Sequence, residues 1–347
     1  MKFYIGNKLI GGDKTFIIAE LSANHNQDIN VALKLIEEAY KVGADAIKLQ
    51  TYTPDTITLN SDKEEFQIKG GTQWDGQTLY SLYNKAYTPW EWTPKLMKRA
   101  NDLGMELFSS PFDISAVDHL EKYNCPAYKI ASLEVSDHIL LKKVAQTGKP
   151  VIISSGGASL EDLESALNVL RKNGTKHIAM LKCTAAYPAD PSDANLKTMV
   201  NMKETFNVIS GLSDHTLGPT VPISSVALGA KIIEKHFTLS RESGSVDDSF
   251  SLTPNEFEEM VKYVRIAEKC LGKVKYGGVN SEKSTKKYRR SLYAIKDIKK
   301  GDILSSENIK SIRPSNGLHT KHYEKILGKK AKVDIDFATP ISWELLE

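Results

Sequence analysis

Residues 16–50 read FIIAELSANHNQDINVALKLIEEAYKVGADAIKLQ, and this stretch decides the expected fold. The apolar run FIIAEL at 16–21 is typical of a buried strand, and DAIKLQ at 45–50 is a second one. Between them Asp28 stands at the position of a helix N-cap, and apolar residues follow at the spacing of one helix face: Ala32, Leu35, Ile36 and Ala39. A strand, a helix and a strand in this order predict a parallel sheet.

The same alternation continues along the chain. Six further apolar runs are each followed by a segment of helical periodicity: ELFSS (106–110), AYKI (127–130), VIIS (151–154), HIAMLKC (177–183), VISGLS (208–213) and KIIEKHF (231–237). Eight such units in roughly 270 residues predict a closed (β/α)8 barrel, or TIM barrel. The alternative is an open, doubly wound sheet.

Polar side chains at the ends of these runs favour the barrel, because a barrel places its chemistry at the carboxyl ends of its strands. Burying so many polar groups without partners would be costly, so they indicate a functional site. All eight predicted strands contribute: Glu20, Lys48, Gln50, Ser109, Ser110, Lys129, Ser132, Ser154, Thr184, Tyr187, Ser213, His215, Glu234 and His236.

One connection, residues 51–88, is much longer than the others and is followed by Pro89, Trp90, Glu91 and Trp92. A long loop at the carboxyl end of a strand is typical of a lid over the mouth of a barrel. We therefore expect the aromatic and glycine-rich part, residues 69–92, to cover the site. The alternative is a contact between subunits.

The end of the chain has a different composition. Residues 273–287 are polar and contain glycine, as in a linker, and residues 288–347 alternate short apolar runs with KKGD, SSEN and PSNG turns. We predict a barrel domain at 1–272, a linker at 273–287 and a small, mainly β domain at 288–347. Residues 286–347 carry 14 Lys and Arg against 8 Asp and Glu. This charge fits a nucleic-acid-binding module or a small anionic substrate, and sparse aromatic stacking positions favour the substrate.

Composition also bears on location. No run approaches ~18 consecutive apolar residues, and the first residues lack the apolar core of a signal peptide, so we expect neither a membrane span nor secretion. Cys125, Cys183 and Cys270 are odd in number and far apart, which disfavours a disulfide framework and a thiolate metal site. The expected location is the reducing cytoplasm.

Two histidines, His215 in GLSDHT and His236 in EKHF, follow the last two predicted strands, which are neighbours in a closed barrel. Two imidazoles without a nearby cysteine fit a catalytic divalent ion completed by water or substrate oxygens. The alternative is that each histidine is an ordinary hydrogen-bonding group.

Lys48 and Lys129 end the second and fourth strands, beside several serines. Two ammonium groups and a set of hydroxyls suit a small molecule that carries phosphate and carboxylate. A Schiff-base lysine and a pair of solvated lysines are the alternatives. Acids near the same ends could bind sugar hydroxyls, ligate metal, move protons or form salt bridges: Glu20, Glu134, Glu234 and Asp247.

Motifs spread over nearly the whole chain resemble the sialic acid synthase family. They are AELSANHN (19–26), GADAIKLQ (43–50), SSPFD (109–113), YKIAS (128–132), ISSGG (153–157), CTAAYP (183–188), GLSDHT (211–216), EKHFT (234–238), RRSLYAIKDIKKGDIL (289–304) and IRPSNG (312–317). The resemblance implies a TIM barrel with a carboxyl-terminal antifreeze-like (SAF) domain. It also implies condensation of phosphoenolpyruvate with the open-chain aldehyde of an N-acetylated amino sugar, which gives a nine-carbon α-keto acid and phosphate.

The resemblance further implies roles for particular residues. Glu20 matches a proton-handling position, and Mn²⁺ or Mg²⁺ is expected on His215 and His236. Glu234, which strand alternation places on the same side as His236, is a second catalytic candidate. Arg313 matches an arginine that the SAF domain inserts into the partner's barrel, which implies a domain-swapped homodimer. The phosphoenolpyruvate-binding positions are Lys48, Ser110, Lys129, Ser132, Ser154, Ser213 and Arg313, and the sugar-binding positions are Gln50, Glu134, Tyr187 and Asp247.

Three departures distinguish this chain from the N-acetylneuraminate type. Leu21-Ser22 replaces the usual Ile-Gly, Ala185 stands where an asparagine is common, and Asp248 stands where a histidine is frequent. The segment GTQWDGQTLYSLYNKAYTPWEW resembles pseudaminic acid synthases, and loss of an amide at 185 fits an acceptor that lacks a hydroxyl. The implied acceptor is 2,4-diacetamido-2,4,6-trideoxy-L-altrose, with N-acetylneuraminate or legionaminate synthesis as the alternatives.

Overall fold

The computed structural model describes residues 1–71 and 74–347, and these form two compact units, residues 1–272 and residues 273–347. The first unit holds the repeated strands and helices. The second is the small unit at the end of the chain.

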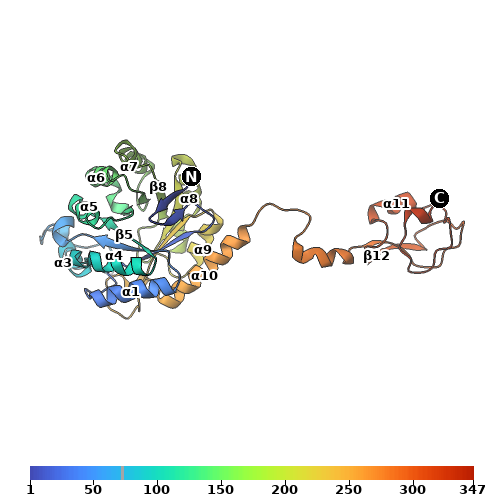
Figure 1. Cartoon of the computed structure of the whole chain (residues 1–347), viewed down its shortest axis with the longest axis horizontal. Helices are drawn as coiled ribbons and strands as arrows, with labels where there is room; N and C mark the ends of the chain where they lie inside the picture. Colours follow the sequence, from blue (N-terminus) through green and yellow to red (C-terminus); the bar gives the residue numbers. More distant parts are fainter. Residues whose placement is uncertain (72–73) are drawn as a thin grey trace. The chain divides into compact units, whose positions relative to one another are not determined.

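Eight parallel strands close into a barrel in the first unit (Figure 1), which confirms the predicted fold class. Every strand begins inside the run that predicted it, and the last strand pairs with the first to close the barrel. In order around the barrel the strands are β3 (Phe16–Glu20), β4 (Ala46–Thr51), β5 (Glu106–Pro111), β6 (Tyr128–Ile130), β7 (Val151–Ser154), β8 (Ile178–Cys183), β9 (Ile209–Asp214) and β10 (Ile232–His236).

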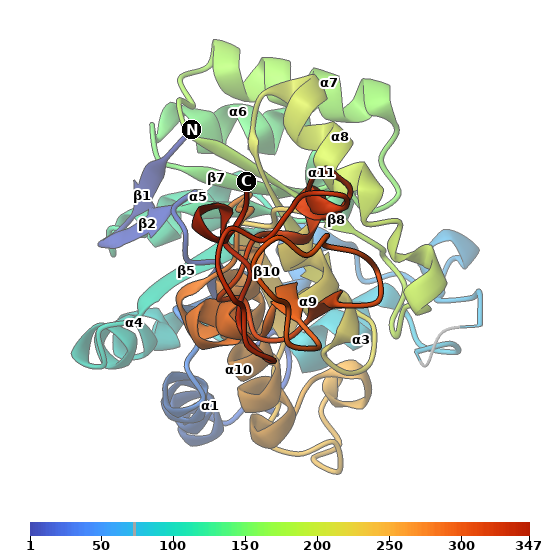
Figure 2. The ribbon, with the colours of Figure 1, turned by 90° about the vertical axis from the view of Figure 1, so that its right-hand side faces the viewer.

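Helices surround the strands (Figure 2), with their apolar faces buried against the sheet. Asp28 caps the first of them as expected, since its side chain accepts from the Asn30 backbone N–H at 2.7 Å. No helix in the described ranges is both long and apolar enough to cross a membrane. The covering helices are α1 (Ile29–Lys41), α4 (Thr93–Asp102), α5 (Ile114–Glu121), α6 (His138–Gln146), α7 (Leu160–Lys172), α8 (Lys197–Phe206), α9 (Thr220–Ala227) and α10 (Pro254–Leu271).

A short hairpin of β1 (Phe3–Ile5) and β2 (Lys8–Ile10) precedes the barrel and was not predicted. It contacts residues at the beginnings of the strands. The Asn7 backbone N–H donates to Glu106 Oε1 at 2.8 Å, and the Phe3 ring stacks on His177 with 5.3 Å between centroids. The hairpin therefore covers part of the amino-terminal end of the barrel.

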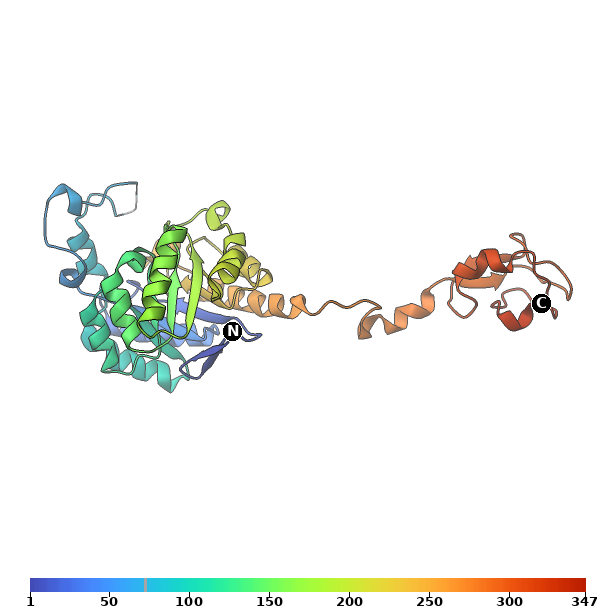
Figure 3. The same ribbon diagram turned by 90° about the horizontal axis from the view of Figure 1, so that it is seen from above.

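The long connection after β4 is partly helical rather than an open loop. It contains α2 (Pro54–Ile57), a 3-10 helix at Glu64–Phe66 and α3 (Leu79–Ala86), which the Thr78 hydroxyl caps. The segment between β4 and α3 projects from the ring of helices (Figure 3, blue). Residues 72 and 73 of the predicted lid lie outside the described residues.

The second unit has its own small core. Strands β11 (Ser291–Ala294) and β12 (Ile309–Ile312) pair antiparallel, and α11 (Tyr323–Ile326) packs Ile326 into the same apolar cluster as Leu292 and Ile309. The stretch predicted as a linker contains most of a 3-10 helix, Asn280–Tyr288. The structure thus confirms the prediction of a small carboxyl-terminal domain with β-structure.

Candidate active site

A cavity of about 350 Å³ opens at the carboxyl ends of the barrel strands. Its wall brings together most of the side chains singled out from the sequence. They are Lys48, Gln50, Lys129, Ser132, Glu134, Ser154, Tyr187, Ser213, His215, Glu234, His236 and Asp247.

Three predicted residues are placed differently. Glu20 and Ser110 lie just behind the wall and contact the Lys48 ammonium group, Glu20 through an ion pair and Ser110 Oγ through a hydrogen bond of 3.3 Å. Arg313 belongs to the second unit, where it lines a surface hollow with Arg289 and Arg290. The role predicted for Arg313 therefore stays a prediction.

The register of the barrel strands explains why Glu20, Lys48 and His236 lie close together. In the barrel, Glu20 is the pairing partner of Lys48 on β4 and of His236 on β10. Because neighbouring strands run parallel, residues that pair in register lie beside one another with their side chains on the same face of the sheet. A carboxylate, an ammonium group and an imidazole are thus set side by side by the sheet alone.

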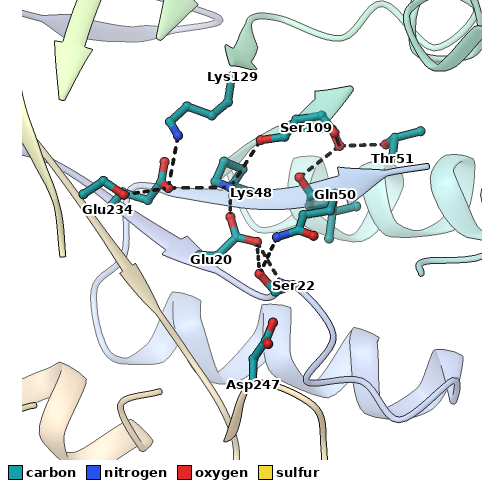
Figure 4. Close-up of polar contacts among 12 residues, drawn as sticks. Glu20, Ser22, Lys48, Gln50, Thr51, Ser109, Lys129, Glu234 and Asp247 are labelled. Atoms are coloured by element: carbon teal, nitrogen blue, oxygen red, sulfur yellow. Dashed lines mark hydrogen bonds and ion pairs between the residues drawn. The ribbon is translucent and has the colours of Figure 1, made fainter. Parts of the chain in front are cut away.

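Four buried charges form an alternating chain (Figure 4). Lys48 pairs with Glu20 and also lies 3.5 Å from Glu234 Oε1, and Lys129 lies 3.5 Å from the same oxygen. Two positive and two negative groups leave this chain with no net formal charge. An anionic substrate therefore needs further positive charge, or a proton, to be bound here without an uncompensated buried charge.

Burial has the largest effect on the four pKa values. It raises the pKa of Glu20 and lowers the pKa of Lys129 because each charged form loses hydration. Burial also acts on Lys48 and Glu234, but their oppositely charged neighbours outweigh it, so the pKa of Lys48 is raised and that of Glu234 is lowered. Neighbouring charges thus favour the charged forms of Lys48 and Glu234, whereas burial favours the neutral forms of Glu20 and Lys129.

The two histidines lie together at the end of β9 and β10, with 5.2 Å between ring centroids. His215 Nδ1 donates to the Thr184 carbonyl at 2.8 Å, which leaves its Nε2 as the available ligand atom. His236 Nδ1 is buried without a hydrogen-bond partner in the described structure, and burial holds the pKa of His236 well below its usual range. His236 is therefore neutral, as a metal-binding imidazole must be.

These features fit an open catalytic metal site. In the described residues, no group of three or more His, Cys, Asp or Glu side chains is arranged to hold an ion. A closed structural site needs four protein ligands, whereas a catalytic site keeps positions for water and substrate. The histidine pair could supply two ligands of such an open site, and the bound ion stays a prediction.

The outer part of the cavity carries weakly acidic carboxyls and aromatic rings. Burial raises the pKa of Glu134 to about 7 and that of Asp247 to about 6. The Tyr187 ring lies 4.2 Å from that of His215 and remains 39% exposed. Ala185 also lines the cavity, so an asparagine at that position would point an amide at the same space.

The long connection forms one wall of the cavity, through Ile68, Trp74, Leu79, Leu82 and Tyr83. Trp74 Nε1 donates to the Val246 carbonyl at 3.3 Å, which links this connection to the segment after β10. Trp90 and Trp92 instead pack on His119 and His25. The predicted covering role thus falls to the part of the connection before Tyr87.

Sequence reasoning missed two buried residues of the site. Cys183 ends β8 in the cavity wall, with its Sγ 4.0 Å from His215 Nδ1. Ser22 follows β3 and hydrogen-bonds both Glu20 and Gln50. The position of Cys183 at a strand end was a usable signal, whereas Ser22 lies beyond the end of β3 and was noted only as a departure from the N-acetylneuraminate type.

The NeuB family model matches residues 35–276, and the SAF domain model matches residues 289–347. The chain belongs to the NeuB family. This NeuB-family chain is 50% identical to the pseudaminic acid synthase of Campylobacter jejuni over 93% of its own length and 94% of the relative's. It is 39% identical to the N,N'-diacetyllegionaminic acid synthase of the same species, over 92% of this chain and 96% of that relative.

A solved structure gives the same picture. The N-acetylneuraminic acid synthetase of Leptospira borgpetersenii superposes with a TM-score of 0.73 at 31% identity, covering 82% of this chain and 95% of that one. The family expected from the motifs is therefore confirmed. The roles of individual residues remain predictions.

Proposed function

We propose that this chain is a transferase that condenses phosphoenolpyruvate with 2,4-diacetamido-2,4,6-trideoxy-L-altrose to give pseudaminic acid and phosphate. The observation that carries the proposal is the convergence of two buried lysines and a histidine pair in one cavity. The identity of 50% to a pseudaminic acid synthase supports the choice of acceptor. N-acetylneuraminate or legionaminate synthesis is the alternative.

Phosphoenolpyruvate is proposed to bind at the deepest part of the cavity. Lys48 and Lys129 supply ammonium groups there, and Ser154 Oγ is buried without a hydrogen-bond partner in the described structure, which suits a phosphate or carboxylate oxygen. The four buried charges already sum to zero. The negative charge of phosphoenolpyruvate is therefore proposed to be balanced by the bound divalent ion and by Arg313. The proposed contacts also include Ser110, Ser132 and Ser213.

His215 and His236 are the proposed ligands of a divalent ion, Mn²⁺ or Mg²⁺. When bound, such an ion acts as a Lewis acid on the aldehyde oxygen of the sugar. The protein's part is to fix both rings: His215 through its hydrogen bond to Thr184, and His236 through burial in neutral form.

The reaction forms a carbon–carbon bond and replaces one carbon–oxygen bond at C2 by another. C3 of phosphoenolpyruvate bonds to the aldehyde carbon, positive charge develops at C2, and water adds there. The C2–O bond to phosphate then breaks as the new C2 hydroxyl becomes the keto group. The water loses two protons in all: one balances the proton gained by the aldehyde oxygen, and the other leaves with phosphate. Glu20 is our candidate for these transfers because burial raises its pKa, with Glu234 held ionised beside it.

The acceptor sugar is proposed to occupy the outer cavity. Gln50, Glu134, Tyr187 and Asp247 offer hydrogen bonds there, and Trp74 and Leu82 offer apolar surface to a deoxygenated sugar. With Ala185 in place of an amide, no buried polar group is left unpaired by the missing hydroxyl.

A phosphate-release assay tests the function. The chain is incubated with phosphoenolpyruvate and, in separate reactions, the altrose derivative, N-acetylmannosamine and the legionaminic acid precursor. We expect the altrose derivative to give the highest kcat/KM, and ¹⁸O in the bridging position of phosphoenolpyruvate to emerge in the phosphate. A preference for another sugar selects an alternative acceptor, and retention of ¹⁸O in the keto acid excludes C–O cleavage.

Metal removal separates this proposal from a Schiff-base aldolase. We expect chelation to abolish phosphate release and added Mn²⁺ or Mg²⁺ to restore it. Full activity after chelation, together with borohydride trapping of pyruvate on Lys48 or Lys129, would favour the aldolase.

A further inference from the structure

Ser22 has an unfavourable backbone conformation at the edge of the site. Its φ of +40° lies in the left-handed region, where four of the other six such non-glycine residues in the described ranges are asparagines. A side chain with a Cβ costs roughly 1 kcal/mol there relative to glycine, and such strain persists where the surroundings impose it. Ser22 is 1% exposed, so the surroundings do hold it.

The Ser22 hydroxyl connects two site residues (Figure 4). It donates to Glu20 Oε1 at 2.5 Å, and the Ser22 backbone N–H donates to the same oxygen at 2.9 Å. It accepts from Gln50 Nε2 at 2.9 Å. The other oxygen of Glu20 is ion-paired with Lys48.

The number of protons fixes the direction of these bonds. A hydroxyl has one proton, and the ionised Glu20 carboxylate takes it, so in this state Ser22 Oγ accepts from Gln50. The Gln50 amide must therefore turn its NH₂ group toward Ser22. Its carbonyl oxygen is left for the cavity that Gln50 lines.

We propose that Ser22 is a positioning residue that makes Gln50 present a hydrogen-bond acceptor to the cavity. Gln50 then recognises a donor on the acceptor sugar, such as an acetamido N–H or a hydroxyl. The inference rests on the proposed function and adds a specificity determinant to it. It also explains why a serine stands at a position that glycine would occupy without strain.

The backbone conformation of Ser22 also affects the next residue, Ala23. The Ala23 backbone N–H points at Asp247 Oδ2, 3.4 Å away. The conformation of Ser22 therefore sets the direction of this N–H as well as that of its own hydroxyl. Ser22 and the backbone N–H that follows it thus contact three polar side chains of the site: Glu20, Gln50 and Asp247.

Two variants separate the hydroxyl from the backbone. Ser22→Ala removes the hydroxyl and keeps the strain, whereas Ser22→Gly removes both. We expect each to raise the KM of the acceptor sugar about tenfold or more, because Gln50 loses its fixed orientation. The calorimetric Kd of the sugar, measured with an unreactive analogue of phosphoenolpyruvate already bound, should rise by the same factor. The KM of phosphoenolpyruvate should stay within about twofold, since Lys48 and Lys129 are unchanged.

Two controls complete the experiment. Ser225→Ala removes another fully buried serine hydroxyl, one that bonds the Pro222 carbonyl in α9, and should leave both KM values unchanged. Gln50→Ala combined with Ser22→Ala should weaken sugar binding no more than Gln50→Ala alone, because both act through one amide. Ser22→Gly should also unfold at a higher temperature than Ser22→Ala.

The outcomes that overturn the inference are distinct. Wild-type kinetics in Ser22→Gly with impaired Ser22→Ala would mean that only the backbone matters, and equal rises in both KM values would mean a general disturbance. Absence of phosphate release by the unaltered enzyme with all three sugars would refute the proposed function instead. The calorimetric Kd for the sugar would still test Ser22 in that case.

Discussion

At the scale of single residues, ionisation of the buried Glu134 side chain should lower the free energy of unfolding by an amount that can be measured. Burial raises its pKa from the ordinary 4.5 to about 7, so the folded protein holds this proton more tightly than the unfolded chain does. The stabilisation from the bound proton is fully present below about pH 4.5 and is lost as the pH rises to about 7.

Glu134→Gln should remove this pH dependence. Relative to the wild type, we expect its free energy of unfolding to increase between pH 4.5 and pH 7 by a few kcal/mol, on the order of 1.4 kcal/mol per pKa unit, and then to level off. Urea unfolding at a series of pH values measures it. Glu164→Gln, on the exposed face of α7, is the control and should run parallel to the wild type. A parallel curve for Glu134→Gln would contradict the raised pKa.

Much of the candidate site could be predicted at this scale, because strand ends in a barrel converge. Lys48, His215 and Glu234 were expected at the mouth and line the cavity. Ser22 could not be found this way, because its significance lies in a positive φ and in the direction of one proton. The identity of a residue as serine predicts neither its φ angle nor the direction of its hydroxyl proton.

At the scale of elements, β9 and β10 are joined behind the histidines by a buried ion pair. Lys235 is fully buried and lies 2.5 Å from Asp214 Oδ2, its partner in the strand register. It also bonds the Thr216 carbonyl. Asp214 and Lys235 directly precede His215 and His236, so the pair fixes the two strands where the histidines leave them.

Lys235→Met should destabilise the barrel strongly, because it leaves the Asp214 carboxylate buried without its charge partner. We expect the free energy of unfolding to fall by about 3–5 kcal/mol, measured by urea denaturation. Lys269→Met, at an exposed position of α10, should change it by less than about 0.5 kcal/mol. Adding Asp214→Asn to Lys235→Met should recover part of the loss. If the double variant is no more stable than Lys235→Met, the ion pair is not the cause.

Long, periodic elements could be predicted well and short ones could not. The eight barrel strands follow from apolar runs of at least four residues, but β1 and β2 have three residues each, too few to establish a pattern. Helix α3 in the long connection was not predicted. The tyrosines and leucines of its sequence, LYSLYNKA, are as compatible with a loop over a site as with a helix. Tertiary packing, not local sequence, determines these elements.

At the scale of the whole molecule, the proposed reaction needs a group from outside the barrel unit. Arg313 belongs to residues 273–347, whereas the cavity is built from residues 1–272. The proposed domain-swapped homodimer would bring Arg313 of one subunit to the cavity of the other. Arg313→Ala should then raise the KM of phosphoenolpyruvate and lower kcat.

Mixed dimers test where Arg313 acts. Arg313→Ala and Glu20→Gln chains with different tags are expressed together and purified through both tags. Each variant alone should have far lower activity than the wild type, but in a swapped dimer one of the two sites has both groups intact, so we expect about half of the wild-type activity. No recovery in the mixed dimer would place Arg313 in its own subunit's site, and failure to recover any doubly tagged protein would contradict the dimer.

The depth of the cavity has a kinetic consequence. The cavity opens at the carboxyl ends of the strands, whereas β1 and β2 cover part of the other end. Lys48 and Lys129 are 4% and 2% exposed, so their ligand must arrive before a sugar fills the space above them. Substrate binding should therefore be ordered, and an unreactive analogue of the sugar should inhibit uncompetitively against phosphoenolpyruvate. Noncompetitive inhibition would indicate that either substrate can bind first.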